Sequence, residues 1–251
     1  MTTNADRARS FDTVAASYAA HRPSYPPALL DAIEELSGRA LAGARVADVG
    51  AGTGIATALL DGRGARVTAV EPGDGMAAQL RRGLPHVPVV RGDGNRLPLR
   101  TGLLDLITYA QSWHWTDPAR SVPEARRVLR PGGALALWWN DSDPTVDWIG
   151  DQDRRLRSFF GAEAPTAYDS RARFRAALPE GLDFRTRLVA WSRRVPIDVH
   201  LANIATYSDF LVADPAAVRD CLDRERALLT ARFPGEEVEE VYVVSLAVAR
   251  P

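Results

Sequence analysis

The sequence contains no lysine, because all 31 residues of its Lys+Arg total are arginine. This absence excludes Schiff-base chemistry on a lysine and any phosphate-binding loop that depends on one. Cysteine occurs once, as Cys221, which excludes an internal disulfide, a zinc cage built from cysteines and a Cys-x-x-Cys redox pair. The scarcity of cysteine favours a reducing, cytoplasmic location.

The chain also lacks a strong net charge, since 31 positive and 32 negative side chains leave a formal charge of -1. No overall field recruits nucleic acid or an anionic membrane, so we expect a small-molecule substrate and no nucleic-acid or membrane partner. No run of about 18 apolar residues occurs, and residues 1–17 have no apolar signal segment, which argues against a membrane span and against export. The pattern does not indicate an oligomeric state.

What the chain does contain is enough apolar sequence, 46% of 251 residues, for one large α/β domain. Between about residues 28 and 140, short apolar runs rich in β-branched residues alternate with Gly or Pro and with helical segments, a pattern typical of βαβ units. Strands covered by helices on both faces have such continuous apolar runs. The predicted strands are 45–50, 66–71, 87–92, 104–109 and 134–140.

A helix is predicted over about 119–129, between the last two of these strands. Asp117 has the character of an N-cap, and Pro118 suits the first helical turn. The segment Pro131-Gly132-Gly133 is expected to stop this helix.

The rhythm changes after Asn140. Residues 141–182 have helical spacing but no convincing strand, which indicates a helical insertion or cap. Beyond it we expect a strand near 184–191, helices within about 199–212 and 215–232, and a buried closing strand at 238–249. One domain with a cap fits this order better than two independent domains.

The strongest local signal is VADVGAGTG at 46–54, which places Gly50, Gly52 and Gly54 between a strand and a helix. Glycines let a ligand approach the backbone, and the helix N-terminus presents free amides. The dinucleotide-binding pattern requires its third glycine where Ile55 stands, which disfavours a nicotinamide-dependent oxidoreductase.

Two carboxylates are expected at the same edge of the sheet as this loop. Glu71 ends the second strand, where it can accept hydrogen bonds from the hydroxyls of a ribose. Asp93, between Gly92 and Gly94 after the third strand, can accept one from an adenine amino group. Ligands in open α/β sheets bind outside the carboxyl ends of the strands, so these signals agree.

Several segments now match one pattern in register: DVGAGTG at 48–54, Glu71, GDGNRLPL at 92–99, DLITYAQ at 105–111 and VLRPGG at 128–133. This set resembles the class I S-adenosylmethionine-dependent methyltransferases of the methyltransferase type 11 branch. FDTVAASYAAHRPSYP at 11–26 and WHWTDP at 113–118 resemble enzymes that methylate small molecules, including the trans-aconitate type. The resemblance covers roughly residues 10–140.

The resemblance implies an α/β fold with a Rossmann-like, seven-stranded, mostly parallel sheet, helices on both faces and a helical cap insertion. It implies an S-adenosylmethionine-binding core with an N-terminal lid at 1–140, a cap or substrate insertion at 141–182 and completion of the sheet by 183–251. The product would be S-adenosylhomocysteine. The activity it implies is in-line transfer of a methyl group to O, N or C of the acceptor.

The resemblance also implies roles for single residues. The first-strand loop would surround the methionine part of the cofactor, Glu71 would hold the ribose, and Ala110 and Gln111 would lie beside the sulfonium. Asn95 departs from the pattern of relatives, which puts the adenine contact at that position in doubt. The complete set of implied cofactor contacts is Tyr18, Arg22, Asp48, Gly50, Gly52, Thr53, Gly54, Glu71, Pro72, Met76, Asp93, Gly94, Ala110 and Gln111.

Candidate substrate residues follow the fourth and fifth strands. His114 stands at the mouth of the expected site, either as a general base or as a histidine bonded to the backbone. His21, His86 and His200 show no clustered partners, so we expect no metal site. Strand alternation sends Trp138 and Trp139 to opposite faces, so at most one reaches a pocket. The candidates for substrate contact are Tyr25, Trp113, Trp115, Trp139 and Asn140.

Two further alternatives stay open. Arginines at 154, 155, 157, 171, 173 and 175 could bind a carboxylate, although a solvated helix face is the favoured interpretation. The protein could also bind S-adenosylmethionine without transferring its methyl group, in a regulatory or cyclisation role, because a fold does not fix a function.

Overall fold

The computed structural model describes residues 14–161 and 174–251, and these form a seven-stranded sheet with the order β3-β2-β1-β4-β5-β7-β6. The first five strands are parallel, whereas β7 runs antiparallel to β5 and β6. The predicted mostly parallel, seven-stranded α/β fold is therefore confirmed. The strands are β1 (Arg45–Val49), β2 (Arg66–Glu71), β3 (Val89–Arg91), β4 (Leu104–Ala110), β5 (Leu129–Ser142), β6 (Arg185–Pro196) and β7 (Glu237–Ala249).

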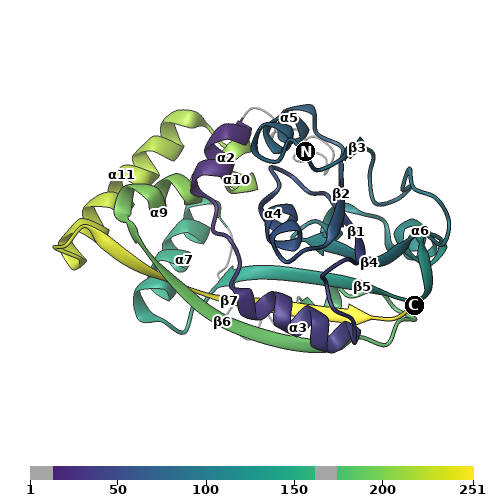
Figure 1. The fold of residues 1–251 in the computed structure, drawn as a ribbon. Coiled ribbons are helices and arrows are strands. Elements are labelled where there is room, and N and C mark those ends of the chain that lie inside the picture. Colours follow the sequence, from purple (N-terminus) through teal and green to yellow (C-terminus); the bar gives the residue numbers. More distant parts are fainter. Residues whose placement is uncertain (1–13, 162–173) are drawn as a thin grey trace.

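Helices cover both faces of the sheet (Figure 1). α3 and α4 pack on one face with Leu29, Ile33 and Leu60, and α6 covers the other with Ala125 and Val128. A third apolar cluster joins α7, α9, α10 and α11 to the far ends of β6 and β7. The helices are α2 (Ala15–His21), α3 (Pro27–Ser37), α4 (Ile55–Gly62), α5 (Asp74–Gly83), α6 (Pro118–Val128), α7 (Asp147–Phe159), α9 (Ile197–Ile204), α10 (Ser208–Val212) and α11 (Pro215–Arg232).

The predicted helix boundaries agree closely with the structure. Asp117 caps α6 as expected, since its carboxylate accepts the backbone N–H of Ala119 at 3.0 Å. Asp214 caps α11 in the same way, accepting the N–H groups of Ala216 and Ala217. None of the helices within residues 14–161 and 174–251 combines the length and the apolar character that a membrane crossing requires.

α6 ends within one residue of its predicted end, but the predicted start of β5 after Pro131-Gly132-Gly133 was wrong. α6 already ends at Val128, and β5 begins at Leu129, five residues before the predicted start at 134. The strand accommodates this segment because its pairing with β4 shifts register between Leu104 and Leu106. Gly132 supports the irregularity with a φ of 74°, which suits glycine.

The strand order changes direction at β1, where a ligand is expected. β1 lies between β2 and β4, so the chain leaves β1 toward one side of the sheet and later returns to its other side. In open α/β sheets this reversal opens a crevice at the carboxyl ends of the two strands. The glycine loop follows β1, and residues 111–115 follow β4, so both predicted motifs lie at this crevice.

Candidate functional site

The glycine loop after β1 has three glycines with left-handed backbone, at φ 66° for Gly50, 58° for Gly52 and 93° for Gly54. A Cβ on Gly50 would lie 2.5 Å from the Cβ of Ser112, so this glycine lets the loop pack against the segment after β4. A Cβ on Gly52 would have no atom of the described residues within 4 Å. Gly50 therefore serves packing, whereas Gly52 faces open space.

Glu71 is fixed at the end of β2 by two backbone amides. Its Oε2 accepts the N–H of Gly52 and its Oε1 accepts the N–H of Gly73, both at 2.7 Å. The side chain is buried. Through these two hydrogen bonds the carboxylate holds the glycine loop against the end of β2.

Asp48, in β1, is fully buried and bonded within the protein. Its oxygens accept the hydroxyls of Thr57 at 2.7 Å and Thr108 at 2.9 Å. Burial raises the pKa of Asp48, and these hydrogen bonds oppose the rise only in part. By contrast, the buried hydroxyl of Thr53 has no hydrogen-bond partner among the described residues. The loop thus contains an unsatisfied polar group of the kind that a ligand satisfies.

The loop after β3 is shaped by close packing. A Cβ on Gly94 would lie within 3.0 Å of Thr116 and Tyr109. Asp93 is exposed, and its Oδ1 accepts the N–H of Asn95 at 2.7 Å. Asn95, the residue that departs from the pattern of relatives, accepts the N–H of Asp117 at the start of α6. Its side chain therefore fastens this loop to α6.

The predicted residues on either side of this loop differ in exposure. Met76 is buried on α5, Pro72 is exposed, and Ala110 is half-buried at the end of β4.

Gln111 and Tyr25 come together at the carboxyl ends of β4 and β5. Gln111 has a φ of 55°, rare for a residue other than glycine, and donates its N–H to the carbonyl of Trp138 at 2.9 Å. Such backbone strain concentrates at functional sites. The Tyr25 ring meets Trp138 edge-on at 5.7 Å. Burial is the largest cause that raises the pKa of Tyr25, to which the neighbouring Asp48 adds, so its hydroxyl stays protonated.

The structure divides the remaining aromatic candidates between the two faces of the sheet. Trp138 packs on the α3 face and Trp139 on the α6 face, as the alternation predicts. Trp139 donates its indole N–H to Nδ1 of His114 at 3.3 Å, and the His114 ring lies 4.6 Å from that of Trp115. Trp113 is buried in the core against Tyr109. His114 and Trp139 are therefore not on the face that holds Tyr25.

The electrostatics of His114 follow from this position. Part of its ring is exposed, but desolvation of the rest lowers the pKa of His114. Because an indole N–H can only donate, Nδ1 accepts, and the proton of the neutral ring lies on Nε2.

Asn140 and the cap arginines have partners within the protein. Asn140 Oδ1 accepts the indole N–H of Trp191 at 2.9 Å, while its Nδ2 has no partner in the described part of the chain. Arg155 binds Glu225 through two nitrogens, at 2.6 and 2.8 Å. Arg154 and Arg157 pair with acidic residues on their own helix, Asp151 and Asp153, and Arg171 and Arg173 lie outside the described residues.

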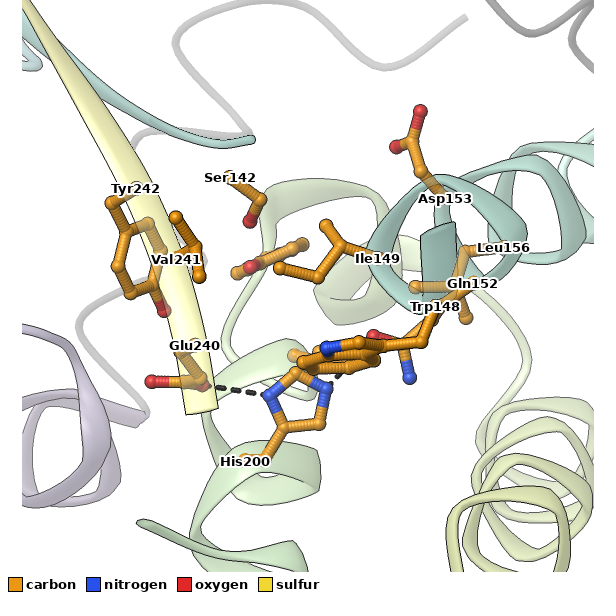
Figure 2. A pocket seen from close by; sticks show the side chains of 12 residues that line it. Ser142, Trp148, Ile149, Gln152, Asp153, Leu156, His200, Glu240, Val241 and Tyr242 are labelled. Atoms are coloured by element: carbon orange, nitrogen blue, oxygen red, sulfur yellow. Dashed lines mark hydrogen bonds and ion pairs between the residues drawn. The ribbon is translucent and has the colours of Figure 1, made fainter. Parts of the chain in front are cut away.

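The expectation that His200 lacks clustered partners was wrong. Its Nδ1 lies 2.7 Å from Glu240, and its Nε2 lies 2.8 Å from Oε1 of Gln152. These three residues border a cavity of about 50 Å³ between α7, α9 and β7 (Figure 2). The partners lie 40 and 48 residues from His200 in sequence, so no local pattern could reveal them. Within the described ranges, no group of three or more His, Cys, Asp and Glu side chains could hold a metal ion.

Arg22 and Tyr18, both predicted to contact the cofactor, lie against the C-terminal helices. Arg22 donates to the hydroxyl and the carbonyl of Thr206 at 2.8 and 3.0 Å. Its guanidinium lies between the rings of Tyr18 and Tyr207. Sequence reasoning did not identify Thr206 or Tyr207, since nothing near them in sequence marks a site.

Comparisons with known proteins agree on one family. Residues 47–137 match the family model described as "Methyltransferase domain". An uncharacterized methyltransferase of Mycobacterium bovis is 37% identical over 226 residues, which cover 89% of this chain and 87% of that protein. Demethylmenaquinone methyltransferase of Beutenbergia cavernae is 37% identical over 134 residues, 51% of this chain and 56% of that protein.

A solved structure supports the same assignment. A structure from Anaeromyxobacter dehalogenans, assigned as a type II methyltransferase, superposes with a TM-score of 0.68 at 27% identity. The superposition covers 91% of this chain and 96% of that one.

Proposed function

We propose that this chain, which belongs to the class I S-adenosylmethionine-dependent methyltransferases, transfers a methyl group to a small-molecule acceptor and releases S-adenosylhomocysteine. The observation that carries the proposal is the glycine loop at the crevice between β1 and β4. Gly52 faces open space there, beside the unsatisfied hydroxyl of Thr53 and the anchored carboxylate of Glu71. These groups fit a ligand with a ribose and a polar amino-acid end.

Within this proposal the loop 50–54 binds the methionine part and Glu71 accepts hydrogen bonds from the ribose hydroxyls. Pro72, Met76, Asp93 and Gly94 surround the adenine. Asp48 acts indirectly, because its carboxylate joins Thr57 on α4 to Thr108 on β4 and so holds the loop between them. Ala110 and Gln111 lie at the end of β4, beside the position where transfer takes place.

When bound, S-adenosylmethionine supplies a sulfonium methyl group that is already a strong electrophile. An acceptor would bond to this methyl carbon through its lone pair, the cofactor sulfur would leave as a thioether, and a hydroxyl or amine acceptor would also lose a proton. The protein must align the acceptor about 3 Å from the methyl carbon and exclude water. Tyr25 helps to align the acceptor as a neutral hydroxyl, because burial raises its pKa and keeps it protonated.

His114 stays a predicted base. Desolvation lowers the pKa of its ring, so it is neutral at pH 7, but Nδ1 accepts the hydrogen bond of Trp139. To take a proton at Nδ1 the ring must release Trp139; until then its Nε2–H is a donor. The His114→Ala variant should lower turnover and leave the affinity for S-adenosylhomocysteine within about twofold; unchanged turnover would remove His114 as a base.

We propose a small molecule rather than a nucleic acid as the class of acceptor. The near-neutral charge of the chain supports this class, as does a relative named for methylation of demethylmenaquinone. Tyr25 lies on the α3 face, where Asn140 accepts a hydrogen bond from Trp191, and Trp139 lies on the α6 face, where it bonds to His114 beside Trp115. An acceptor on one face would therefore contact only one of these two groups. A cytoplasmic location is proposed from the single cysteine.

The test has two stages. Calorimetry should first show binding of S-adenosylhomocysteine to the full chain, and absence of binding would refute the proposal. Methyl-labelled S-adenosylmethionine is then incubated with candidate acceptors, including quinones, phenols, amines and carboxylates. Label should move to an acceptor. Product formation while the label stays on the cofactor would favour a cyclisation or other non-methylating role instead.

A further inference from the structure

The N-terminal helix α2 bridges the two halves of the molecule. It packs against α5, which belongs to the proposed cofactor side, and against α9, which belongs to the C-terminal helices (Figure 1). Tyr18 lies on this helix, and Tyr25 follows it and reaches Trp138 and Gln111. The position of α2 therefore determines how this end of the chain meets the crevice.

Arg22, directly after α2, fastens the helix to the loop between α9 and α10. Its Nε donates to Oγ1 of Thr206, and its Nη2 donates to the carbonyl of the same residue. The rings of Tyr18 and Tyr207 lie on the guanidinium at 4.8 and 4.7 Å, a distance at which cation–π attraction is effective. The contacts of Arg22 thus lead toward the C-terminal half rather than toward the glycine loop.

Arg193, on β6, forms a second connection to the same helix. Its Nη2 donates to the carbonyl of His21, the last residue of α2, at 3.1 Å, and its Nε donates to Glu240. Glu240 is buried; burial alone would raise its pKa, but hydrogen bonds from His200 and Arg193 outweigh it and hold the pKa below the usual range. The ionised carboxylate fixes the direction of the Arg193 guanidinium.

Glu240, which holds Arg193, belongs to a series of hydrogen bonds in which each donor and acceptor can be assigned. Glu225 can only accept, so Gln152 donates its NH2 to it at 3.1 Å and presents Oε1 to His200. Both ring nitrogens of His200 therefore donate, Nε2 to Oε1 of Gln152 and Nδ1 to the carboxylate of Glu240, because each of these oxygens can only accept. Figure 2 shows His200 between Glu240 on β7 and Gln152 on α7. These hydrogen bonds connect α11, α7, α9 and β7, and so they fix the position of Glu240 and of Arg193, which binds it. We call the contacts of Arg22 and Arg193 with the C-terminal half the tether of α2.

We infer that Arg22 and Arg193 are positioning residues that hold α2 over the cofactor end of the sheet. The inference rests on the proposed function and revises the role that the resemblance implied for Arg22. Arg22 acts on the cofactor through α2 and Tyr18, not by contact. Tyr207 extends the connection, because it stacks on Arg22 and also borders the cavity beside His200.

The chain offers a matched control for this inference. Arg187 lies on β6 like Arg193 and also ties an N-terminal helix, since it donates two hydrogen bonds to Glu35 on α3 at 2.8 and 3.1 Å. α3 does not lie over the crevice. The test set is Arg22→Gln, Arg22→Lys and Arg193→Gln, with Arg187→Gln as the control. Arg22→Gln leaves no buried charge without a partner, so it remains informative if Arg193→Gln is poorly folded.

Two measurements are made on the full chain. Hydrogen exchange without cofactor should show faster exchange of α2 amides in Arg22→Gln and Arg193→Gln than in wild type, and wild-type exchange in Arg187→Gln. Stopped-flow dissociation of S-adenosylhomocysteine should be at least about tenfold faster for Arg22→Gln and for Arg193→Gln, since each variant loses two hydrogen bonds of a charged group and the loss of one such bond already has about this effect. Dissociation from Arg22→Lys should be slower than from Arg22→Gln, because lysine keeps the positive charge.

The outcomes separate the two proposals. The tether is refuted if wild type binds S-adenosylhomocysteine but Arg22→Gln and Arg193→Gln release it at the wild-type rate and show unchanged hydrogen exchange of the α2 amides. An equal acceleration in Arg187→Gln would refute it as well, because the effect would then be general. If wild type does not bind S-adenosylhomocysteine, the proposed function fails, while the exchange experiment still decides whether the arginines hold α2.

Discussion

Alanine substitutions at three glycines separate the folding role of the loop from its binding role. Gly50, Gly52 and Gly102 all have left-handed backbone, with φ of 66°, 58° and 63°. An alanine in this region is strained by about 1–2 kcal/mol relative to glycine. Gly102 lies before β4, at the opposite end of the strands from the loop, and a Cβ there or on Gly52 would meet nothing within 4 Å. The Gly52→Ala and Gly102→Ala variants should therefore lose the same stability.

Gly50→Ala should lose more. Its Cβ would lie 2.5 Å from the Cβ of Ser112, whose hydroxyl donates to the carbonyl of Val49 and cannot move without breaking that bond. Such overpacking costs about 1–3 kcal/mol, so the total destabilisation should be about 2–5 kcal/mol. Urea unfolding of the three variants at one pH gives this comparison directly.

Binding should rank the variants differently. Gly52→Ala places a methyl group in the open space where the cofactor is proposed to approach, so its affinity for S-adenosylhomocysteine should fall at least about tenfold, or 1.4 kcal/mol. Gly102→Ala should bind like wild type. Calorimetry measures both. If Gly52→Ala retains wild-type affinity while it is no less stable than Gly102→Ala, the open face of Gly52 is not the cofactor site.

Three further substitutions test single contacts. Glu71→Gln should weaken S-adenosylhomocysteine binding about 10–100-fold by calorimetry, because an amide NH2 cannot accept a backbone N–H and a charged hydrogen bond is lost, whereas exposed Glu35→Gln should not. Thr108→Val should destabilise the protein by about 1.5–3 kcal/mol at pH 7 in urea, with Thr68→Val as the control. Because the lost hydrogen bond stabilises the ionised carboxylate, the deficit should shrink as pH falls through the folded-state pKa of Asp48, which burial raises above its unfolded value; a pH-independent deficit would contradict the contact. Trp139→Phe should raise the pKa of His114 in an NMR titration, because only the neutral ring accepts the indole N–H, and an unchanged pKa would show that this bond does not persist in solution.

The parallel half of the sheet was predictable because its signals are local. β1, β2 and β3 are apolar runs followed by Gly or Pro, and β1, β2 and β4 begin where predicted. β5 and β6 were predicted too short for two reasons. Leu129 joins β5 through a register shift that no sequence pattern marks, and β6 continues to Pro196 because β7 pairs with it along its whole length.

The site divides in the same way. Residues directly after β1, β2 and β4 were predictable because parallel strands bring their carboxyl ends to one edge. The partners of those residues were not. Trp113 has the sequence context of a pocket residue yet is buried in the core, and Arg22 and Thr206 meet across 184 residues. Contacts of this kind depend on how helices dock, which neither spacing nor composition encodes locally.

This division has a consequence for specificity. The methyltransferase family model matches residues 47–137, which include the glycine loop and Glu71 but none of Arg22, Arg193 and Thr206. The part that the family shares therefore contains the proposed cofactor contacts, and the tether of α2 lies outside it. α9, α10 and α11 lie between β6 and β7 in the sequence, and α2 packs against α9. Substitutions in this part of the chain can therefore change the position of α2 without disturbing the glycine loop. We therefore expect residues 15–25 and 138–249 to contribute to the choice of acceptor, together with Trp115 and His114 of the shared segment.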